Sequence, residues 1–369
     1  MANENNNPSL QELSADKFGP LLKYIEDDNV TDINLNRDGR ELWIADLQRG
    51  KYLVEKHDCN SEFVQRFVHH VQNHENVQFN PMNPVLESET GRLRISCVHP
   101  SAALSGMSIC IRKSPPIIRL TKEKAIEEKF IPEPVLNLLI NCVHARMNFV
   151  FCGEPGVGKT ECAKFFSQFI PAEQRVITIE DNLEFHYKEI NPGKDCVELK
   201  VSKDEEIFGY SKALKTCLRQ NPDWIMLSEA RSTEVKYLLE CWSTGISGFT
   251  TLHTDDVRKI PDRIQNMLGS NSDAERLEND IFSFVDVGIL IRKRKNSEGN
   301  MYRYVDQVCF YVREGDKNRT VMMVEDGAMV KVPSTNENGN RKKVYQSLPS
   351  DVVKKLMFAD VVHPFECAD

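Results

Sequence analysis

The sequence predicts an α/β protein in which a phosphate-loop domain with a parallel sheet follows a smaller α+β domain. One observation is a G-x-x-x-x-G-K-[ST] motif at 153–160, placed between an apolar run and a helical pattern. A second is the alternation of strands and helices after this motif, which favours a parallel sheet with helices on both faces. A third is the length of 369 residues, which is too great for one ordinary core.

The motif reads Gly-Glu-Pro-Gly-Val-Gly-Lys-Thr. Its glycines allow the backbone to wrap closely around phosphates, and the loop N–H groups and the helix N-terminus supply partial positive charge. We expect Lys159 to reach the β- and γ-phosphates of ATP and Thr160 to hold Mg²⁺ through its hydroxyl. A glycine-rich turn that carries a lysine by chance would not need the strand and helix on either side. The candidate nucleotide-binding residues here are Gly153, Glu154, Pro155, Gly156, Val157, Gly158, Lys159, Thr160 and Glu161.

Composition shifts divide the chain into four parts. Residues 1–10 are asparagine-rich without periodicity and are expected to form a disordered tail. Residues 11–115 form the N-terminal α+β domain, which ends at a Ser-Pro-Pro stop. The charged residues 116–131 are expected to be a linker, and residues 132–369 the phosphate-loop domain with a C-terminal β extension.

The N-terminal domain is expected to contain two helices and two pairs of strands. Its first helix is short, and the strand after it alternates apolar and polar residues before an Arg-Asp-Gly-Arg turn, which indicates a hairpin. The second helix has apolar residues at helical spacing. The expected ranges are helices 18–25 and 61–74 and strands 30–36, 41–45, 91–97 and 107–113.

The phosphate-loop domain is expected to open with an apolar helix over 132–145 that leads to the strand before the loop. The late strands are expected to extend the sheet in antiparallel fashion, before a last helix. The expected strands are 176–179, 224–227, 249–252, 285–291, 302–312 and 321–324, and the expected helices are 210–219, 233–242, 257–268 and 350–358.

Composition limits the classes of function. No apolar run approaches the length of a membrane span, and the polar N-terminus lacks a signal-peptide core, so we expect a cytoplasmic protein. Eleven cysteines, most of them in apolar runs and none in a C-x-x-C pair, are expected to be reduced and to hold no zinc. The net charge of −8 argues against nucleic acid as a direct ligand.

Polar groups follow three of the apolar strands at the edge of the sheet that carries the phosphate loop. Glu180 follows the strand 176–179, Glu229 follows 224–227, and His253 follows 249–252. Hydrolysis of a phosphoanhydride needs one carboxylate to orient or deprotonate water and another to organise Mg²⁺ through its hydration shell. We prefer Glu229 for the Mg²⁺ shell and Glu180 for the water, although the sequence does not fix which carboxylate has which role.

Each of these residues has a plainer interpretation. Glu180 could be a surface acid that pairs with Arg175 or Lys188, Glu229 could pair with Arg231, and His253, our candidate sensor of the γ-phosphate, could cap a strand. Three polar endings in succession after a phosphate loop favour the catalytic interpretation. Arg112, Arg219 and Arg231 are candidate cations for the phosphates, although each alone could be a surface charge.

Four motifs in order are similar to those of the secretion-superfamily ATPases, which power type II and type IV secretion, conjugation and type IV pilus extension or retraction. The resemblance is strong over about residues 130–310 and weaker in the N-terminal domain. The motifs are the phosphate loop, the acidic box Ile177–Asp181, the run Leu218–Ile225 that leads into Ser228–Arg231, and Thr244-Gly245 leading to Thr251–Thr254.

The resemblance implies a RecA-like motor domain and a homohexameric ATPase that associates peripherally with the inner membrane through partner proteins. It implies that nucleotide lies between the two domains and that Arg112, Arg219 and Arg231 make nucleotide or subunit contacts. The sequence departs from the family at Glu154-Pro155, where Pro-Thr is commoner, and at Ser228, where Gly is usual. The type II tetracysteine insertion is missing, and the strand 285–292 is more similar to the type IV secretion and conjugation branch.

Three functions compete at this stage. The first is a hexameric ATPase motor for type IV secretion or conjugation, with a type IV pilus motor as its alternative. The second is a nucleic-acid motor of the helicase or recombinase type, which the acidic balance disfavours. The third is a scaffold that binds ATP without hydrolysis, which the presence of both Glu180 and Glu229 disfavours.

Overall fold

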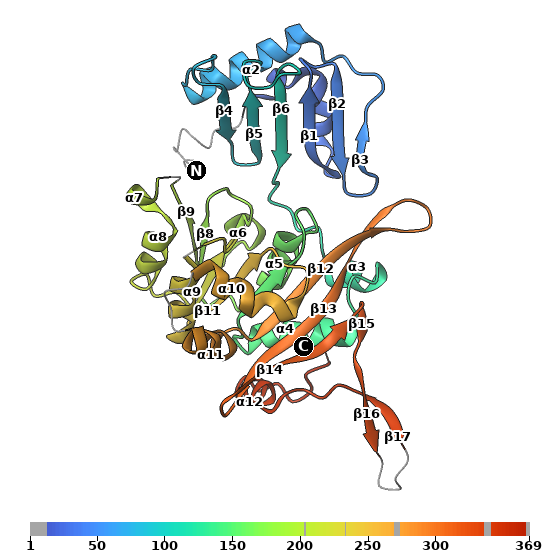
Figure 1. Cartoon of the computed structure of the whole chain (residues 1–369), viewed down its shortest axis with the longest axis vertical. Coiled ribbons are helices and arrows are strands. Elements are labelled where there is room, and N and C mark those ends of the chain that lie inside the picture. Colours follow the sequence, from blue (N-terminus) through green and yellow to red (C-terminus); the bar gives the residue numbers. More distant parts are fainter. Residues whose placement is uncertain (1–12, 203, 233, 269–273, 336–340, 367–369) are drawn as a thin grey trace. The chain divides into compact units, whose positions relative to one another are not determined.

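The computed structural model describes residues 13–202, 204–232, 234–268, 274–335 and 341–366, so the expected tail at 1–10 lies outside the described residues. The chain divides into two compact units (Figure 1). Unit 1 comprises residues 1–116 and 294–302, and unit 2 comprises residues 117–293 and 303–369.

Unit 1 is a six-stranded antiparallel sheet with the order β3-β2-β1-β6-β5-β4. Alternating strand residues such as Ile33 and Ile111 point to one core, where they pack with Phe67 of the long helix. Asn60 begins that helix, because its side chain accepts the backbone N–H of Phe63. The elements of this unit are η2 (Ala15–Lys17), η3 (Gly19–Leu21), α1 (Leu22–Glu26), β1 (Val30–Asn36), β2 (Glu41–Asp46), β3 (Gly50–Leu53), α2 (Ser61–Glu75), β4 (Val85–Glu89), β5 (Leu93–Val98) and β6 (Ser108–Lys113).

Unit 2 is built on a nine-stranded sheet with the order β15-β14-β13-β12-β7-β11-β10-β8-β9. The strands from β12 to β9 in this order run parallel, while β13, β14 and β15 form the antiparallel extension (Figure 1). The expectation that the strand 285–291 belongs to the antiparallel extension is wrong, because β12 pairs in parallel with β7. The parallel part of the sheet comprises β7 (Phe149–Cys152), β8 (Val176–Glu180), β9 (Cys196–Lys200), β10 (Trp224–Leu227), β11 (Ser247–Leu252) and β12 (Val287–Lys295), and the extension comprises β13 (Met301–Glu314), β14 (Lys317–Glu325) and β15 (Ala328–Met329).

Helices cover both faces of this sheet. Phe149 and Phe151 of β7 face one apolar cluster, and Val150 and Cys152 face the other, so even the short central strand is buried on both sides. The first cluster includes residues of α4, α5 and α12, and the second includes residues of α8, α9, α10 and α11. The helices are α3 (Lys122–Glu127), α4 (Glu133–His144), α5 (Lys159–Ser167), α6 (Tyr187–Ile190), α7 (Glu205–Phe208), α8 (Tyr210–Cys217), α9 (Glu234–Ser243), η4 (Val257–Lys259), α10 (Ile260–Leu268), α11 (Ala274–Phe284) and α12 (Ser350–Phe358), beside a separate hairpin of β16 (Lys331–Thr335) and β17 (Arg341–Tyr345).

The segment expected as a linker, 116–131, has structure of its own. It contains α3, which Thr121 caps at its start, and Ala125, Phe130 and Ile131 are buried in the core of unit 2. The charged residues of this segment occupy the exposed face, which explains why its composition suggests a linker. In addition, residues 294–302, which the sequence places in the phosphate-loop domain, belong to unit 1.

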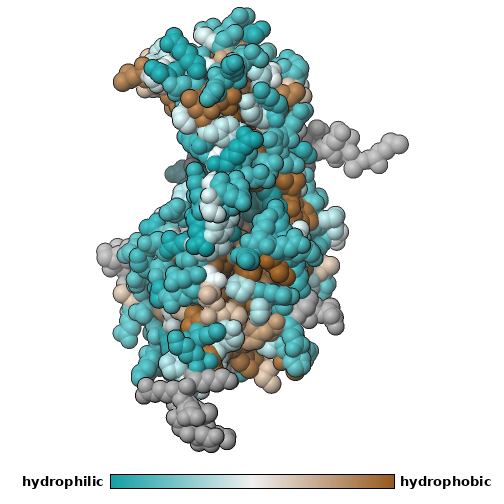
Figure 2. All heavy atoms as spheres, turned by 90° about the vertical axis from the view of Figure 1, so that its right-hand side faces the viewer, coloured by the Kyte–Doolittle hydropathy of each residue, from teal (hydrophilic) through white to brown (hydrophobic). Residues whose placement is uncertain are grey.

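Hydrophilic side chains cover most of the face shown in Figure 2, and apolar side chains reach the surface in patches. Leu104, Met82, Phe358 and Val362 are among the large apolar residues that are mostly exposed. Within the described ranges, the structure has no helix whose length and apolar character would allow it to cross a membrane.

Candidate nucleotide-hydrolysis site

The phosphate loop joins β7 to α5, and its glycines have a backbone that other residues adopt poorly. Gly153, Gly156 and Gly158 have φ values of +138°, +72° and +98°. A Cβ on Gly153 would also lie 2.4 Å from the carbonyl oxygen of Ile291, on the neighbouring strand β12. The backbone shape of the loop and its close packing against β12 therefore require glycine at these positions.

Lys159 begins α5 and its side chain folds back over the loop. Its Nζ donates to the carbonyl oxygens of Gly153 at 3.0 Å and Glu154 at 3.1 Å, and lies 3.2 Å from Nδ1 of His253. Lys159 is buried, with an exposed fraction of 8%. This position fits the predicted role of a cation that meets phosphate oxygens at the loop.

The structure brings together Glu229, at the end of β10, and His253, at the end of β11. His253 Nε2 lies 2.9 Å from Glu229 Oε1. Nδ1 of the same ring lies 3.2 Å from Nζ of Lys159 and 3.1 Å from the carbonyl oxygen of Gly153. With a proton on Nε2 alone, Nδ1 accepts from Lys159, and with protons on both nitrogens it donates to Gly153. The imidazole of His253 thus connects the carboxylate of Glu229 to Lys159 of the phosphate loop.

Arg231 extends this network to the acidic box. Its guanidinium contacts Glu229 Oε2 at 2.8 Å and Asp181 Oδ2 at 2.7 Å. Burial raises the pKa of Asp181, but the charge of Arg231 and the hydrogen bonds from Arg231 and Tyr210 together lower it below its usual value. The pairing of Glu229 with Arg231 that the plainer interpretation foresees therefore exists, and it is part of a chain of contacts that reaches Lys159.

Glu180 does not share this environment. It ends β8 with an exposed fraction of 2%, and its Oε1 accepts the backbone N–H groups of Glu184 and Phe185, each at 3.0 Å. Burial raises the pKa of its carboxyl group to about 8. The carboxyl group of Glu180 therefore lies against the backbone of the loop that follows β8. It forms neither of the surface pairs with Arg175 or Lys188, and Arg175 pairs with Asp195 at 2.9 Å.

Two residues near the phosphate loop were missed by sequence reasoning. Thr160 Oγ1 donates to Glu184 Oε2 at 3.1 Å, and Lys293 Nζ of β12 donates to the carbonyl oxygen of Pro155 at 3.3 Å. Glu184 lies in an irregular loop, where no periodicity indicates which way a side chain points. Lys293 follows the predicted strand 285–291 and could have been found by extending that strand two residues.

The remaining predicted cations, Arg112 and Arg219, are both exposed. Arg219 is exposed after the end of α8, and Arg112 is exposed on β6 of unit 1, opposite Asp32 and Arg94 in the register of the sheet. Their predicted nucleotide contacts stay predictions. Glu161, in the first turn of α5, contacts Lys164 at 3.1 Å and Arg119 at 3.8 Å. Val157 is buried in the core below the loop.

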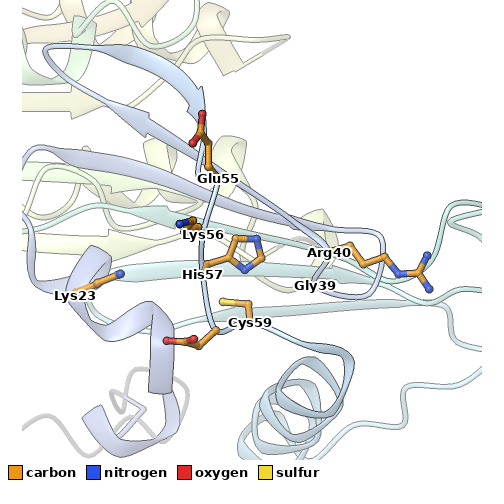
Figure 3. A pocket seen from close by; sticks show the side chains of 8 residues that line it. Lys23, Gly39, Arg40, Glu55, Lys56, His57 and Cys59 are labelled. Atoms are coloured by element: carbon orange, nitrogen blue, oxygen red, sulfur yellow. The ribbon is translucent and has the colours of Figure 1, made fainter.

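A separate cavity of about 620 Å³ lies in unit 1 and contains none of the predicted site residues. Figure 3 shows His57 and Cys59 close together, while the side chain of Arg40 extends away from them. The charged groups therefore do not converge on one point. The cavity is lined by Lys23, Gly39, Arg40, Glu55, Lys56, His57, Asp58 and Cys59.

The sequence and the fold are both similar to those of known proteins. Residues 78–346 match the family described as "Type II/IV secretion system protein", which is most of the chain. The chain belongs to this secretion family. The family match and the phosphate loop on the larger unit together identify it as a P-loop ATPase of that family.

Individual relatives of this secretion ATPase are distant. It is 27% identical over 309 residues to an uncharacterized protein of Bacillus anthracis, covering 80% of this chain and 68% of that protein. It is 24% identical over 331 residues to the type IV secretion system protein VirB11 of Brucella suis biovar 1, covering 79% and 88%. A solved structure of the pilus retraction motor PilT with bound ADP has a TM-score of 0.60 at 20% identity, covering 82% of this chain and 84% of that one, which shows the shared fold.

Proposed function

We propose that this protein is a homohexameric motor that hydrolyses ATP with Mg²⁺ to drive a type IV secretion or conjugation machinery at the inner membrane. The observation that carries the proposal is the network from Asp181 through Arg231, Glu229 and His253 to Lys159, on the phosphate loop of a secretion-family ATPase. The type IV branch is supported by the relative named VirB11.

The residues have distinct roles in this mechanism. Lys159 meets the β- and γ-phosphates, and Thr160 offers its hydroxyl to Mg²⁺. When bound, Mg²⁺ would neutralise charge on the bridging and terminal phosphates. His253 donates from Nε2 to Glu229, and its Nδ1 contacts Lys159 of the phosphate loop. Glu229 is held in position by Arg231, and we assign it the role of orienting water near the γ-phosphate. This reverses our preference from the sequence, because the carboxyl group of Glu180 is buried against backbone N–H groups.

Phosphate release from ATP tests this proposal. Wild type and Lys159→Ala are assayed with Mg²⁺ over a range of protein concentrations, with light scattering on the same samples. We expect activity that depends on Lys159 and rises with concentration as hexamers form. Monomers at micromolar concentration with ATP and Mg²⁺ would contradict the hexamer, and activity equal in the Lys159→Ala variant would contradict the site. Stimulation by DNA would favour a nucleic-acid motor instead.

A further inference from the structure

The residue that follows the phosphate-loop motif is an acid, Glu161, in the first turn of α5. The backbone N–H groups of a first turn have no partner within the helix, and they make this end of the helix partly positive. No side chain caps α5 at Gly158, and in a phosphate loop such N–H groups meet the phosphates of the nucleotide. The carboxylate of Glu161 is therefore attracted by the same positive end of the helix as those phosphates.

Two cations contact Glu161 through one of its carboxylate oxygens. Oε1 lies 3.1 Å from Nζ of Lys164, which is 1% exposed, and 3.8 Å from the guanidinium of Arg119. Oε2 is buried and has no hydrogen-bond partner among the residues that the structure describes. A buried carboxylate oxygen without a partner is costly, so the hydrogen bonds of Glu161 do not account for an acid at this position. Its negative charge is the property that remains to explain its presence.

Arg303 of β13 brings a third cation to the same place. Its Cδ lies 3.7 Å from the point that a Cβ on Gly158 would occupy, and Cβ of Glu161 lies 4.0 Å from that point. Burial and the charge of Arg119 lower the pKa of Arg303, whereas the charges of Glu161 and Glu128 oppose this shift. With the two cations described above, three positive charges share two carboxylates beside the phosphate loop.

We propose that Glu161 is a resident counter-ion of the nucleotide site, which competes with the α- and β-phosphates of ADP or ATP for Arg119 and Arg303. When a nucleotide occupies the loop, these arginines turn toward its phosphates, and Glu161 remains beside them as a negative charge. The acid thereby lowers the affinity for the nucleotide and speeds the release of ADP after hydrolysis. This inference rests on the proposed function, and it adds two arginines of the same chain to the phosphate contacts of the loop.

Equilibrium binding and dissociation of a fluorescent ADP analogue test the proposal without turnover. The analogue is displaced with unlabelled ADP, ATP or adenosine in EDTA, so that no metal contributes to the affinity. The variants are Glu161→Gln and Glu161→Ser, which both remove the charge, and Arg303→Met, which removes a charge from a long side chain. Thermal melts identify a variant that fails to fold, and the second substitution of Glu161 then takes the place of the first.

Asp351→Asn is the matched control for Glu161→Gln. Asp351 also lies in the first turn of a helix, α12, and it pairs at 3.0 Å with Lys354, three residues further along. Glu161 has the same arrangement with Lys164, but α12 does not follow the phosphate loop. The control therefore shows what the loss of a paired first-turn acid does to the protein apart from the nucleotide site.

We expect both Glu161 variants to bind ADP and ATP about 10-fold more tightly than wild type, because a negative charge near the phosphates is removed. They should also release the analogue more slowly. Arg303→Met should bind both nucleotides about 10-fold more weakly, because it loses a charged donor to phosphate. Displacement by adenosine should stay within about twofold of wild type in every variant, since adenosine carries no charged phosphate. Asp351→Asn should follow wild type throughout.

An ADP affinity that is unchanged or weaker in both Glu161 variants would overturn the role of the acid. An unchanged ADP affinity in Arg303→Met, or an equal loss of affinity for ADP and adenosine, would overturn the phosphate contact of the arginine. A wild type that binds ADP but releases no phosphate from ATP would overturn the proposed hydrolysis and leave the competition for the arginines intact. A wild type that binds neither ADP nor ATP would overturn both.

Discussion

The ends of β8 and β10 carry the same residue type at the same edge of one sheet, yet their environments differ. Glu180 ends β8 with its carboxyl group buried against two backbone N–H groups. Glu229 follows β10 with a side chain that is 19% exposed and contacts an imidazole and a guanidinium. Burial with backbone partners suits a structural tie, whereas partial exposure with side-chain partners suits chemistry. The role of a strand-end glutamate is thus decided by what surrounds its carboxyl group.

The largest effect is expected at the β10 end. Glu229→Gln keeps the size of the side chain but removes the charge that faces His253 and Arg231, so phosphate release should fall by about 10²–10³-fold. Binding of the nucleotide analogue should remain within a few-fold of wild type, because the phosphate loop is unchanged. The control is Glu240→Gln, an exposed acid on α9. Turnover near the wild-type rate would break the contrast between the two strand ends.

Arg231 is the residue that links Glu229 to the acidic box, and its removal gives a smaller effect. Arg231→Ala should lower phosphate release by up to about 10²-fold, because the carboxylate of Glu229 loses one of the contacts that fix its position. The free energy of unfolding should change by at most about 1 kcal/mol, since the Arg231 side chain is 51% exposed and exposed ion pairs contribute little.

Arg319→Ala is a suitable control for Arg231→Ala. It removes an arginine of similar exposure, 55%, from its pair with Glu314 on the antiparallel extension. Both variants should unfold at similar urea concentrations while only Arg231→Ala loses turnover. Equal turnover in the two would show that Glu229 keeps its position without Arg231.

The last expected effect concerns the pH dependence of stability at the β8 end and is measured in unfolding, whereas the two preceding effects are measured in turnover. The pKa of Glu180 is raised from about 4.5 to about 8 in the folded protein. Between these pH values the folded state holds a proton that the unfolded state lacks, so the contribution of Glu180 to stability is lost as pH rises from about 5 to 8. The slope is at most about 1.4 kcal/mol per pH unit. Urea unfolding at pH 5, 6.5 and 8 should show a shallower slope for Glu180→Gln than for wild type, and equal slopes would contradict a protonated Glu180.

Local patterns were sufficient to predict the parallel sheet and the strand-end residues. The motif at 153–160 fixes a strand before it and a helix after it, and buried strands such as β10 read as unbroken apolar runs. The strand β9 was missed, because it lies at the sheet edge and its Cys-Val-Glu-Leu-Lys sequence is only half-buried. The parallel order of the strands then brings their ends together, which is why Glu229 and His253 contact each other.

The rest depends on contacts that sequence patterns do not encode. The loop after β8 turns back because Glu180 binds its backbone, and only that turn brings Glu184 to Thr160. In the same way, Phe130 and Ile131 look like the end of a charged segment until the core of unit 2 is seen to bury them. In both cases a contact sets the course of an irregular segment: the carboxyl group of Glu180 in the first, and the apolar core of unit 2 in the second.

Residues 294–302 belong to unit 1, although residues of unit 2 precede and follow them in the sequence, and this affects how the two units are joined. The polypeptide passes between the two units three times, at 116–117, 293–294 and 302–303. The backbone N–H of Met301 donates to the carbonyl oxygen of Gln48, so this returning segment is hydrogen-bonded inside unit 1. A single protease cut at 116–117 would therefore separate residues 1–116 from the rest of unit 1, because the segment 294–302 stays covalently joined to unit 2 on both sides. Neither unit can be excised as one uninterrupted stretch of sequence.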